Sequence, residues 1–319
     1  MQKKRFIHSA LEWIAKIILF FLILAAGLLS FEKFDGEEVP IFHHTARQPL
    51  VRLLFVGDMM FDRQARITAG SKGDDYVFSC ADDTLRKYDA VVGNLEGPIT
   101  HNDSLSQGSV VGSHNNYVFT FPLATPKLLL RHNIQIVNLG NNHILNFGTE
   151  GLKETREALD ASGVGYFGGV RGSTSIYRKT FGGRPFSFVN FNEFGGDSAT
   201  TTAAEIVKEK VAGNTVILYA HWGDEYMDVP DRVREWTNLF LGSGADAVIG
   251  SHPHVVQGWG TVNGKPYYYS LGNFIFDQYW SADVSNGLAV EMVFDGPKIT
   301  TKEFNVHIGR DGRSCIATE

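Results

Sequence analysis

Two histidines, His252 and His254, stand one residue apart in the segment GSHPHVV (250–256), with Pro253 between them. Pro253 has no backbone N–H and disfavours the α conformation of the residue before it, so a helix is excluded here. In extended chain, residues two apart point to the same face and lie roughly 6–7 Å apart. That distance suits two imidazoles that bind a pair of metal ions spaced by about 3.5–4 Å. The histidines therefore predict metal ligands, and the alternative is two ordinary polar loop residues.

Four other apolar runs also end in polar residues, and the five endings together indicate a site. The other four endings are Gly57-Asp58, Gly93-Asn94-Leu95-Glu96, Asn141-Asn142-His143 and His221-Trp222-Gly223. In α/β proteins the carboxyl ends of parallel strands meet at one edge of the sheet, and ligands bind there. Each ending also has a structural explanation, since Asp58 could cap a helix, Asn94 could belong to a turn and His221 could be a hydrogen-bonded structural residue. Their convergence favours a binding site.

The residue types at this edge suit a borderline divalent cation. Zn²⁺, Mn²⁺ and Fe²⁺ bind imidazole together with carboxylate and amide oxygens. We therefore predict a site for one or two divalent metal ions per chain, of Mn, Zn or Fe. The expected ligands are Asp58, Glu96, Asn142, His221, His252 and His254. His143, beside the metal, is expected to protonate a leaving group, and the residues expected to support the ligands are Asn94, Glu225 and Asn273.

The elements that must position these residues alternate along the chain. Short apolar runs predict strands at residues 52–58, 89–94, 134–143, 185–191, 215–223, 246–254 and 265–274. Helical patterns lie between them at residues 151–163, 203–213 and 233–244. This alternation predicts an α/β fold with a mainly parallel sheet. Residues 288–308 predict a β-hairpin closed by Asp295-Gly296, and the polar insertion at 97–121 is typical of a lid or binding loop.

The N-terminal residues differ from the rest of the chain in composition. Residues 17–31 form an unbroken apolar run, preceded by Lys3, Lys4 and Arg5. With the segment just upstream, the run reaches the roughly 20 residues that a spanning helix needs. Because the basic residues come first, the positive-inside rule places the N-terminus in the cytoplasm and the bulk of the chain outside. A cleaved signal peptide is the alternative.

These features predict the organisation of the chain. We expect residues 1–31 to be a cytoplasmic tip and a signal-anchor helix, and residues 32–50 to be a linker. Residues 51–310 are expected to form the extracytoplasmic domain of a single-pass protein of the cell membrane. One anchor without a large apolar bundle does not make an export channel by itself.

Composition excludes several classes of protein. The chain has 319 residues, of which 43% are hydrophobic and 20% charged, as in a folded domain rather than a disordered chain. Its formal net charge of −6 gives no sign of nucleic-acid binding. Cys80 and Cys315 form no CxxC motif, and we expect neither a disulfide framework nor cysteine metal ligands. The histidines expected to be solvated are His43, His44, His101 and His114.

The polar endings resemble those of the CapA family of capsule-synthesis proteins, of the poly-γ-glutamate PgsA type, which is similar to the calcineurin-like metallophosphoesterases. The matching segments are GDMM (57–60), GNLEGPIT (93–100), NLGNNHILNFGTEGL (138–152), AHWGDEY (220–226), GADAVIGSHPHVVQ (244–257) and YYSLGNFIFD (268–277). They span roughly residues 51–280. The resemblance implies a layered α-β-β-α metallophosphoesterase-like sandwich, preceded by the N-terminal membrane helix. It also implies a membrane-anchored protein that acts outside the cell in making or exporting an anionic capsule polymer.

The resemblance to the phosphoesterases carries over residue by residue. Their Asn-His pair matches Asn142-His143, their later lone histidine matches His221, and their Gly-His-x-His matches the segment with His252 and His254. Their opening Asp-x-His is Asp58-Met59-Met60 here, so one histidine ligand is replaced by methionine. Their bridging aspartate is also replaced, which leaves Glu96 or Asn94 for that role.

Three functions remain open from the sequence. The first is a metal-dependent hydrolase that cleaves phosphoester or polymer bonds at the cell surface. The second is a non-catalytic accessory subunit that binds an anionic polymer such as poly-γ-glutamate or supports the membrane proteins of a capsule synthase. The third is a binding protein for an anionic small molecule.

Overall fold

The computed structural model describes residues 49–170 and 176–317. The expected cytoplasmic tip and signal-anchor helix, with nearly all of the expected linker, lie outside these residues. Within the two described ranges, no helix combines the length and apolar character that crossing a membrane requires.

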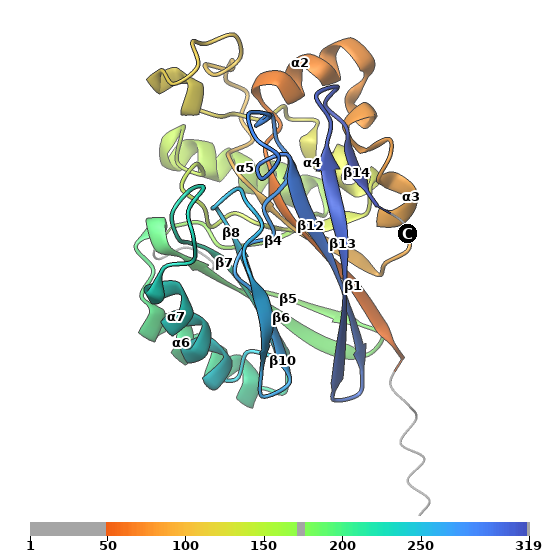
Figure 1. The fold of residues 1–319 in the computed structure, drawn as a ribbon, viewed down its shortest axis with the longest axis vertical. Helices are drawn as coiled ribbons and strands as arrows, with labels where there is room; N and C mark the ends of the chain where they lie inside the picture. Colours follow the sequence, from red (N-terminus) through yellow and green to blue (C-terminus); the bar gives the residue numbers. More distant parts are fainter. Residues whose placement is uncertain (1–48, 171–175, 318–319) are drawn as a thin grey trace, which may run out of the picture. The chain divides into compact units, whose positions relative to one another are not determined.

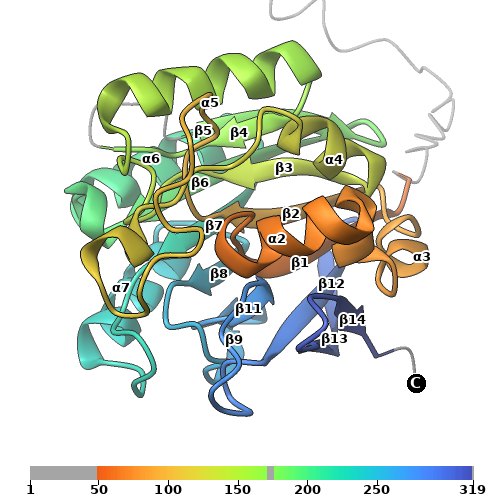
Figure 2. The same ribbon diagram turned by 90° about the horizontal axis from the view of Figure 1, so that it is seen from above.

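The first of two sheets carries the strands from both ends of the described chain. Its strands are β1 (Val51–Met59), β2 (Ala90–Leu95), β3 (Ile134–Asn138), β4 (Gly165–Phe167), β11 (Asn273–Ile275), β12 (Asn286–Asp295), β13 (Lys298–Ile308) and β14 (Ser314–Ile316). The order is β14-β13-β12-β1-β2-β3-β4, and β11 pairs with the end of β1. Figure 2 shows β4, β3, β2 and β1 one after another. These four strands and β11 are parallel, whereas β12, β13 and β14 continue the sheet in antiparallel pairs.

The second sheet is built from the middle of the chain. Its strands are β5 (Ile176–Phe181), β6 (Arg184–Asn192), β7 (Thr215–His221), β8 (Ala247–Ser251), β9 (Trp259–Val262) and β10 (Lys265–Tyr268), in the order β5-β6-β7-β8-β10-β9. The four inner strands are parallel, and the two outer ones are antiparallel. The carboxyl ends of β6, β7 and β8 therefore lie together, as those of β1, β2 and β3 do in the first sheet.

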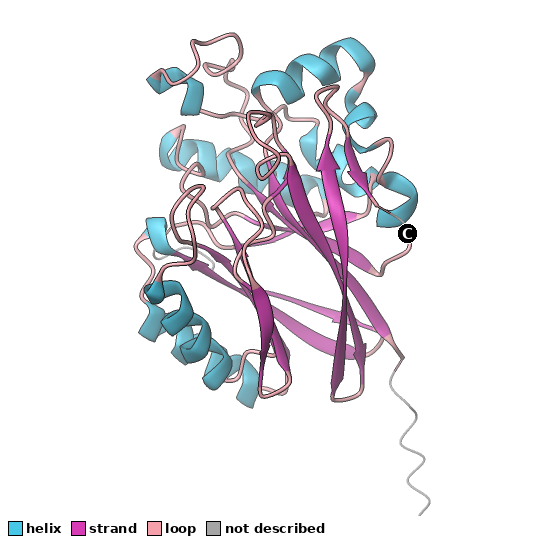
Figure 3. Cartoon of the chain, viewed as in Figure 1, coloured by secondary structure: helices cyan, strands magenta, loops and turns pink. Residues whose placement is uncertain are grey.

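The two sheets pack face to face with helices on their outer sides (Figures 1 and 3). Phe55 and Val92 of the first sheet share one buried cluster with Phe186 and Tyr219 of the second. The helices are α2 (Arg63–Lys72), α3 (Asp82–Leu85), α4 (Thr125–Arg131) and α5 (Gly148–Ser162), beside the first sheet, and α6 (Ala199–Val211) and α7 (Asp231–Gly242), beside the second. Three short 3₁₀ turns are η1 (Asp74–Phe78), η2 (His114–Tyr117) and η3 (Glu193–Gly195). The inner parallel strands β2, β7 and β8 are therefore buried on both faces, which explains why they are continuous apolar runs.

The structure confirms the predicted α/β fold and the hairpin, which is formed by β12 and β13. The three predicted helices overlap α5, α6 and α7, each of which begins and ends earlier than predicted. Four predicted strands were too long, because the chain leaves the sheet after Asn138, His221, Ser251 and Tyr268, and the last run divides into β10 and β11. The first sheet also continues past residue 310, where β14 pairs with β13.

A close approach between β1 and the loop before β11 requires glycine at position 57. A Cβ atom on Gly57 would lie 1.9 Å from the carbonyl oxygen of Gly272. The next residue, Asp58, donates its backbone N–H to that same oxygen at 3.0 Å. Since any side chain would separate the two segments, Gly57 fixes where Asp58 and Asn273 meet.

The insertion at 97–121 is held against the body of the domain by a buried carboxylate. Asp62 is fully buried and accepts hydrogen bonds from Arg66 Nε at 2.9 Å, Ser104 Oγ at 2.6 Å and the backbone N–H of Thr120 at 2.9 Å. Because a buried carboxylate must be satisfied by donors, Asp62 fixes both arms of the insertion.

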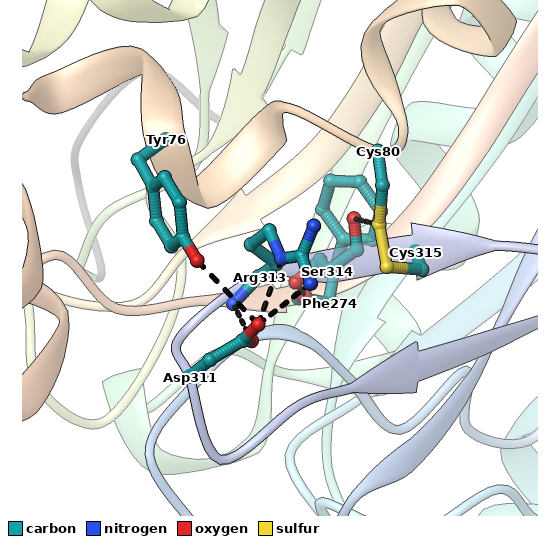
Figure 4. The surroundings of a disulfide bond; sticks show 7 residues. All are labelled: Tyr76, Cys80, Phe274, Asp311, Arg313, Ser314 and Cys315. Carbon is teal, nitrogen blue, oxygen red and sulfur yellow. Dashed lines mark hydrogen bonds and ion pairs between the residues drawn. A yellow bond between two sulfur atoms is a disulfide. The ribbon is translucent and has the colours of Figure 1, made fainter. Parts of the chain in front are cut away.

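Cys80 and Cys315 form a disulfide bond, so the expectation that the chain has none is wrong (Figure 4). The two cysteines are 235 residues apart, and no spacing rule links them. The pairing arises because β14 adds to the edge of the first sheet, which brings the Cα atoms to 4.9 Å. Ser314, next to Cys315, also donates its hydroxyl to the carbonyl of Phe274, so the C-terminal strand is fixed on both sides.

We expect loss of this disulfide to destabilise the domain. The bond closes a very long loop in the unfolded chain, and native disulfides typically contribute about 2–4 kcal/mol to the free energy of unfolding. The variant Cys80→Ser/Cys315→Ser should therefore show a lower urea midpoint than the oxidised protein. The reduced wild type is the matched control and should unfold like the double variant. Equal midpoints for the oxidised wild type and the double variant would show that the bond is not formed.

Candidate metal centre

Two buried carboxylates lie at the carboxyl ends of neighbouring strands in the first sheet. Asp58 belongs to β1, and Glu96 directly follows β2. Both are fully buried. Asn94 lies between them and donates from Nδ2 to Asp58 Oδ1 at 2.8 Å and to Glu96 Oε2 at 3.2 Å. The strand pairing places Asp58 directly opposite Asn94, so the parallel sheet itself sets this contact.

His254 lies against both carboxylates. Its Nδ1 is 2.9 Å from Asn273 Oδ1 and 3.3 Å from Asp58 Oδ2, and its Nε2 is 3.4 Å from Glu96 Oε1. Both neighbours of Nδ1 are acceptors, so Nδ1 carries a proton and Nε2 faces Glu96. Asn273 is itself fixed, because its Nδ2 donates to Gln278 Oε1 at 3.0 Å and to the carbonyl of Val284 at 2.9 Å. Asn273 thus orients His254, as a supporting residue does around a metal ligand.

The backbone at His252 and His254 is not extended, so that expectation is wrong. Strand β8 ends at Ser251, and the two histidines have φ values of 98° and 58°. The chain turns here because the backbone N–H of His252 bonds to Asp58 Oδ2 at 3.2 Å and the carbonyl of Pro253 accepts from the N–H of Tyr226 at 2.9 Å. The two imidazole rings still lie 6.0 Å apart. Positive φ at two non-glycine residues is strained, and such strain gathers at functional sites.

His221 and Asn142 are brought together beside His252. His221 Nε2 is 2.9 Å from Asn142 Oδ1, and its ring centre is 4.7 Å from that of His252. His221 Nδ1 lies 3.0 Å from Ser251 Oγ. Burial, and then the charges of nearby histidines, hold the pKa of His221 well below its ordinary value. The expected ligand roles of His221 and Asn142 remain predictions.

His143 presents one nitrogen toward Glu96. Its Nδ1 lies 3.1 Å from the carbonyl of Tyr117 and 3.2 Å from Asn146 Oδ1, so Nδ1 carries the proton. Nε2 is 4.0 Å from Glu96 Oε1. Burial lowers the pKa of His143 to about 4, so the ring is neutral at neutral pH. The insertion supplies both Tyr117 and the ring of Phe119, which lies 4.3 Å from the imidazole. The insertion therefore orients His143, whose role as a proton donor remains a prediction.

The electrostatics of the centre favour a cation. Burial, and then the charge of Asp58, raise the pKa of Glu96 well above its ordinary value. Burial also raises the pKa of Asp58, but the hydrogen bond and charge of His254 outweigh it, and the net pKa is lowered. In the centre, the buried atoms Glu96 Oε1 and His252 Nδ1 have no hydrogen-bond partner among the described residues. Burial lowers the pKa of His252 to about 3, so its ring is a neutral electron-pair donor.

Two overlapping groups of side chains have the spacing of metal ligands. In the first, Asp58, Glu96 and His254 each offer an atom within 4.8 Å of the others, and in the second Glu225, His252 and His254 do the same. Glu225, which the sequence indicated only as a supporting residue, is an exposed member of the second group. Asn94 and Asn273 lie where supporting residues are expected, on the carboxylates and on His254 respectively.

Met60 contributes nothing to this centre. Its side chain is fully buried in the core beside the first sheet, and its Sδ lies 3.0 Å from the backbone N of Asp62. A thioether is a poor ligand for hard and borderline cations. Met60, which stands where the phosphoesterases have a histidine ligand, is therefore a core residue and not a metal ligand.

Arg63 and several aromatic residues are the neighbours that sequence reasoning missed. The guanidinium of Arg63 bonds to Asp277 at 2.5 Å and lies 5.0 and 5.5 Å from the rings of Phe119 and Phe276. Those rings pack on His143 and His254. Phe194 lies 4.3 Å from His252. No local pattern identifies these residues, because they come from different loops.

Comparison with known proteins places the chain in a family. The profile of the family described as "Bacterial capsule synthesis protein PGA_cap" matches residues 52–278, a range that contains every residue of the centre. The chain belongs to this PGA_cap family. The expected CapA resemblance is thereby confirmed.

Three curated relatives of the PGA_cap chain are similar over part of its length. "PGA biosynthesis protein CapA" of Bacillus subtilis is 30% identical over 71% of this chain and 63% of the relative. "Capsule biosynthesis protein CapA" of Bacillus anthracis is 27% identical over 79% and 66%. The "Probable polyglutamine synthesis accessory protein" Rv0574c of Mycobacterium tuberculosis is 26% identical over 44% of each chain. The matched part thus covers less than two thirds of each relative's length.

We expect Glu96→Gln to stabilise the metal-free domain at high pH. The folded pKa of Glu96 is raised, so its contribution to stability is complete below its unfolded value of 4.5 and is lost as pH rises toward the folded pKa. In chelator, the variant should exceed the wild type in free energy of unfolding by about 1–3 kcal/mol near pH 8, with no difference below about pH 4.5.

The measurement is urea unfolding at a series of pH values. The histidines add the same pH dependence to the free energy of unfolding of both proteins, so this contribution cancels in the difference between them. Glu157→Gln is the matched control, since the side chain of Glu157 is 66% exposed, and it should match the wild type at every pH. A wild type as stable as Glu96→Gln at high pH would contradict the raised pKa.

Proposed function

We propose that this chain is an extracytoplasmic accessory protein for the synthesis or export of an anionic capsule polymer such as poly-γ-glutamate, and that it works through a divalent metal centre. Membership of the PGA_cap family and the names of the relatives support the polymer class. The observation that carries the metal centre is the buried pair Asp58 and Glu96 on either side of His254.

The donor set fits a divalent cation of the Mn, Zn or Fe type. Asp58 and Glu96 supply two buried carboxylates, and His254 directs its Nε2 toward Glu96. A cation here would satisfy the buried oxygen Glu96 Oε1 and offset the burial and the charge of Asp58 that raise the pKa of Glu96. When bound, such an ion supplies Lewis acidity and lowers the pKa of a bound water.

A second ion has a less complete donor set. His252 offers an unpartnered buried Nδ1, and His221 Nε2 and Asn142 Oδ1 face each other at 2.9 Å. A cation between these atoms would replace their mutual contact. Position 60, however, carries a methionine, so the imidazole ligand that a histidine would supply there is missing. We therefore propose one firmly held ion, with a second that depends on His221, Asn142 and Glu225.

The surrounding residues hold the centre rigid. Asn94 donates to both carboxylates, Asn273 fixes the ring of His254, and the insertion fixes His143. The neutral Nε2 of His143 can accept a proton from a group bound next to Glu96. This arrangement orients a ligand and can move one proton, in a layered sandwich of the metallophosphoesterase type.

A location outside the cytoplasmic membrane fits the chemistry of the chain. The disulfide between Cys80 and Cys315 is of a kind that persists in oxidising compartments and is rare in the cytosol. Together with the apolar run at residues 17–31, it supports a single-pass anchor with the domain outside. The proposed partners are the membrane proteins of a capsule synthase and the polymer itself, with no role for nucleic acid.

An active metal-dependent phosphoesterase or polymer hydrolase is the second candidate. The observation that favours it is His143, whose free nitrogen lies 4.0 Å from Glu96 at the edge of the centre. A hydrolase needs such a group beside a metal-bound water. The two candidates share the metal and differ in turnover.

We expect His254→Ala to weaken metal binding strongly. The full-length chain should carry about one tightly bound Mn²⁺ or Zn²⁺, and the variant should bind it more than about 100-fold more weakly, beyond the usual effect of a supporting residue. Calorimetric titration and elemental analysis measure this. His101→Ala is the control, since that side chain is 71% exposed and lies outside both groups. Equal metal affinity in wild type and His254→Ala would remove the basis of the proposal.

Turnover separates the two candidates. The metal-loaded chain is assayed on a generic phosphoester and on a γ-linked glutamate oligomer, and the accessory role predicts no turnover that depends on His143. Capsule formation is measured in the host after replacement of the gene by Asp58→Asn, and we expect it to be lost. Turnover that disappears in His143→Ala would establish the hydrolase instead.

A further inference from the structure

The short strand β11 carries the residue that orients His254. It spans Asn273–Ile275, and among the described strands it pairs with β1 alone. Asn273 Oδ1 accepts from His254 Nδ1 at 2.9 Å, so the direction of that ring follows the position of β11. A strand with a single short pairing has little local stability of its own. The centre therefore needs a second support for β11.

Strand β14 gives that support. Ser314 is fully buried and donates its hydroxyl to the carbonyl of Phe274, the middle residue of β11 (Figure 4). Phe274 is itself fully buried, so bulk water does not reach it. Without Ser314 a buried acceptor would lose its donor, which costs more than the loss of an exposed hydrogen bond. The hydroxyl thus holds β11 at the residue next to Asn273.

The disulfide in turn holds β14. This strand has three residues at the edge of the first sheet, where β13 is its sole neighbour among the described strands. Cys315, beside Ser314, is bonded to Cys80, which lies between η1 and α3. The Cys80 side also reaches β11, because the ring of Phe78 lies 6.4 Å from that of Phe274. Both segments joined by the disulfide therefore contact the same residue of β11.

The contacts form a continuous path from the disulfide to the metal centre. In order, its residues are Cys315, Ser314, Phe274, Asn273 and His254. Each step joins neighbours in the chain or is a hydrogen bond between buried groups. Without the disulfide, β14 could move away from β11, and the imidazole would lose its fixed orientation toward the two carboxylates.

We propose that the Cys80–Cys315 disulfide controls metal binding through Ser314, which is a positioning residue for His254. The inference rests on the proposed metal centre and adds its regulation, since the centre reaches full affinity only in the oxidised chain. An external disulfide that exchanges with the two cysteines takes up their two electrons and two protons and leaves as two thiols. A chain with free thiols, as in a reducing compartment, binds the ion weakly until the bond forms.

Metal affinity tests the path at two points. The full-length chain is titrated with Mn²⁺ by calorimetry. We expect Ser314→Ala, with its disulfide intact, to bind about tenfold more weakly, as after loss of a supporting residue. Cys80→Ser/Cys315→Ser should show a loss of similar size. Because both changes act through one contact, the combined variant should bind no more weakly than the weaker of the two.

Ser187→Ala is the matched control. Ser187 is a fully buried serine of β6 in the second sheet, and its hydroxyl donates to Glu209 Oε2 at 2.6 Å. The control loses a comparable buried hydrogen bond away from the centre, so its Mn²⁺ affinity should equal that of the wild type. Thermal unfolding verifies that each variant is folded. An equal loss of affinity in Ser187→Ala and Ser314→Ala would show a general effect of stability and overturn the proposal.

A metal-free measurement keeps this proposal separate from the proposed function. In the ¹⁵N-histidine-labelled chain with chelator, the Nδ1–H of His254 gives an NMR signal that is identified by its loss in His254→Ala. We expect Ser314→Ala to shift and broaden this signal and Ser187→Ala to leave it unchanged. If the wild type binds no Mn²⁺, the proposed function fails and the signal alone decides whether Ser314 positions His254. An unchanged signal in Ser314→Ala, or an unchanged affinity where the wild type binds Mn²⁺, overturns the proposal.

Discussion

Two carboxylates buried side by side, Asp58 and Glu96, impose the constraint on which the rest of the site depends. Removing like charges from water is costly unless donors or a cation compensate for them. Here the donors are the amide of Asn94 and the imidazole of His254. Among the described residues, no lysine or arginine forms a hydrogen bond with either carboxylate. These contacts do not offset burial and the neighbouring charge of Asp58, which together raise the pKa of Glu96.

The fold serves this pair at several levels. Parallel pairing of β1 with β2 sets Asp58 opposite Asn94, and the bare backbone of Gly57 lets the loop before β11 approach closely enough to bring in Asn273. The second sheet contributes the loop after β8, whose two histidines adopt positive φ and thereby turn toward the first sheet. One sheet thus provides the charge and the other the imidazoles, and the apolar core between the sheets holds them in register.

The polar ends of the apolar runs were the part of the site that sequence could predict. A strand buried on both faces is a continuous apolar run, so its end can be recognised in the sequence. Asp58, Glu96, His221 and His254 all lie at or just after such an end, where ligands bind in α/β proteins. Other features depend on contacts between distant segments. The Cys80–Cys315 bond needs a C-terminal strand at a sheet edge, and the turn at His252 needs the carboxylate of Asp58 as acceptor. Glu225 and Arg63 likewise acquire their positions only when loops from different strands meet.

The central claim is that Asp58, Glu96 and His254 hold a divalent ion. Its most direct test is a crystal structure of the full-length chain grown with Zn²⁺, with anomalous diffraction recorded on both sides of the zinc absorption edge. The account predicts a zinc peak within about 2.0–2.2 Å of a carboxylate oxygen of Asp58, a carboxylate oxygen of Glu96 and Nε2 of His254. A zinc peak bound elsewhere, or a centre with no anomalous signal at saturating zinc, would contradict it.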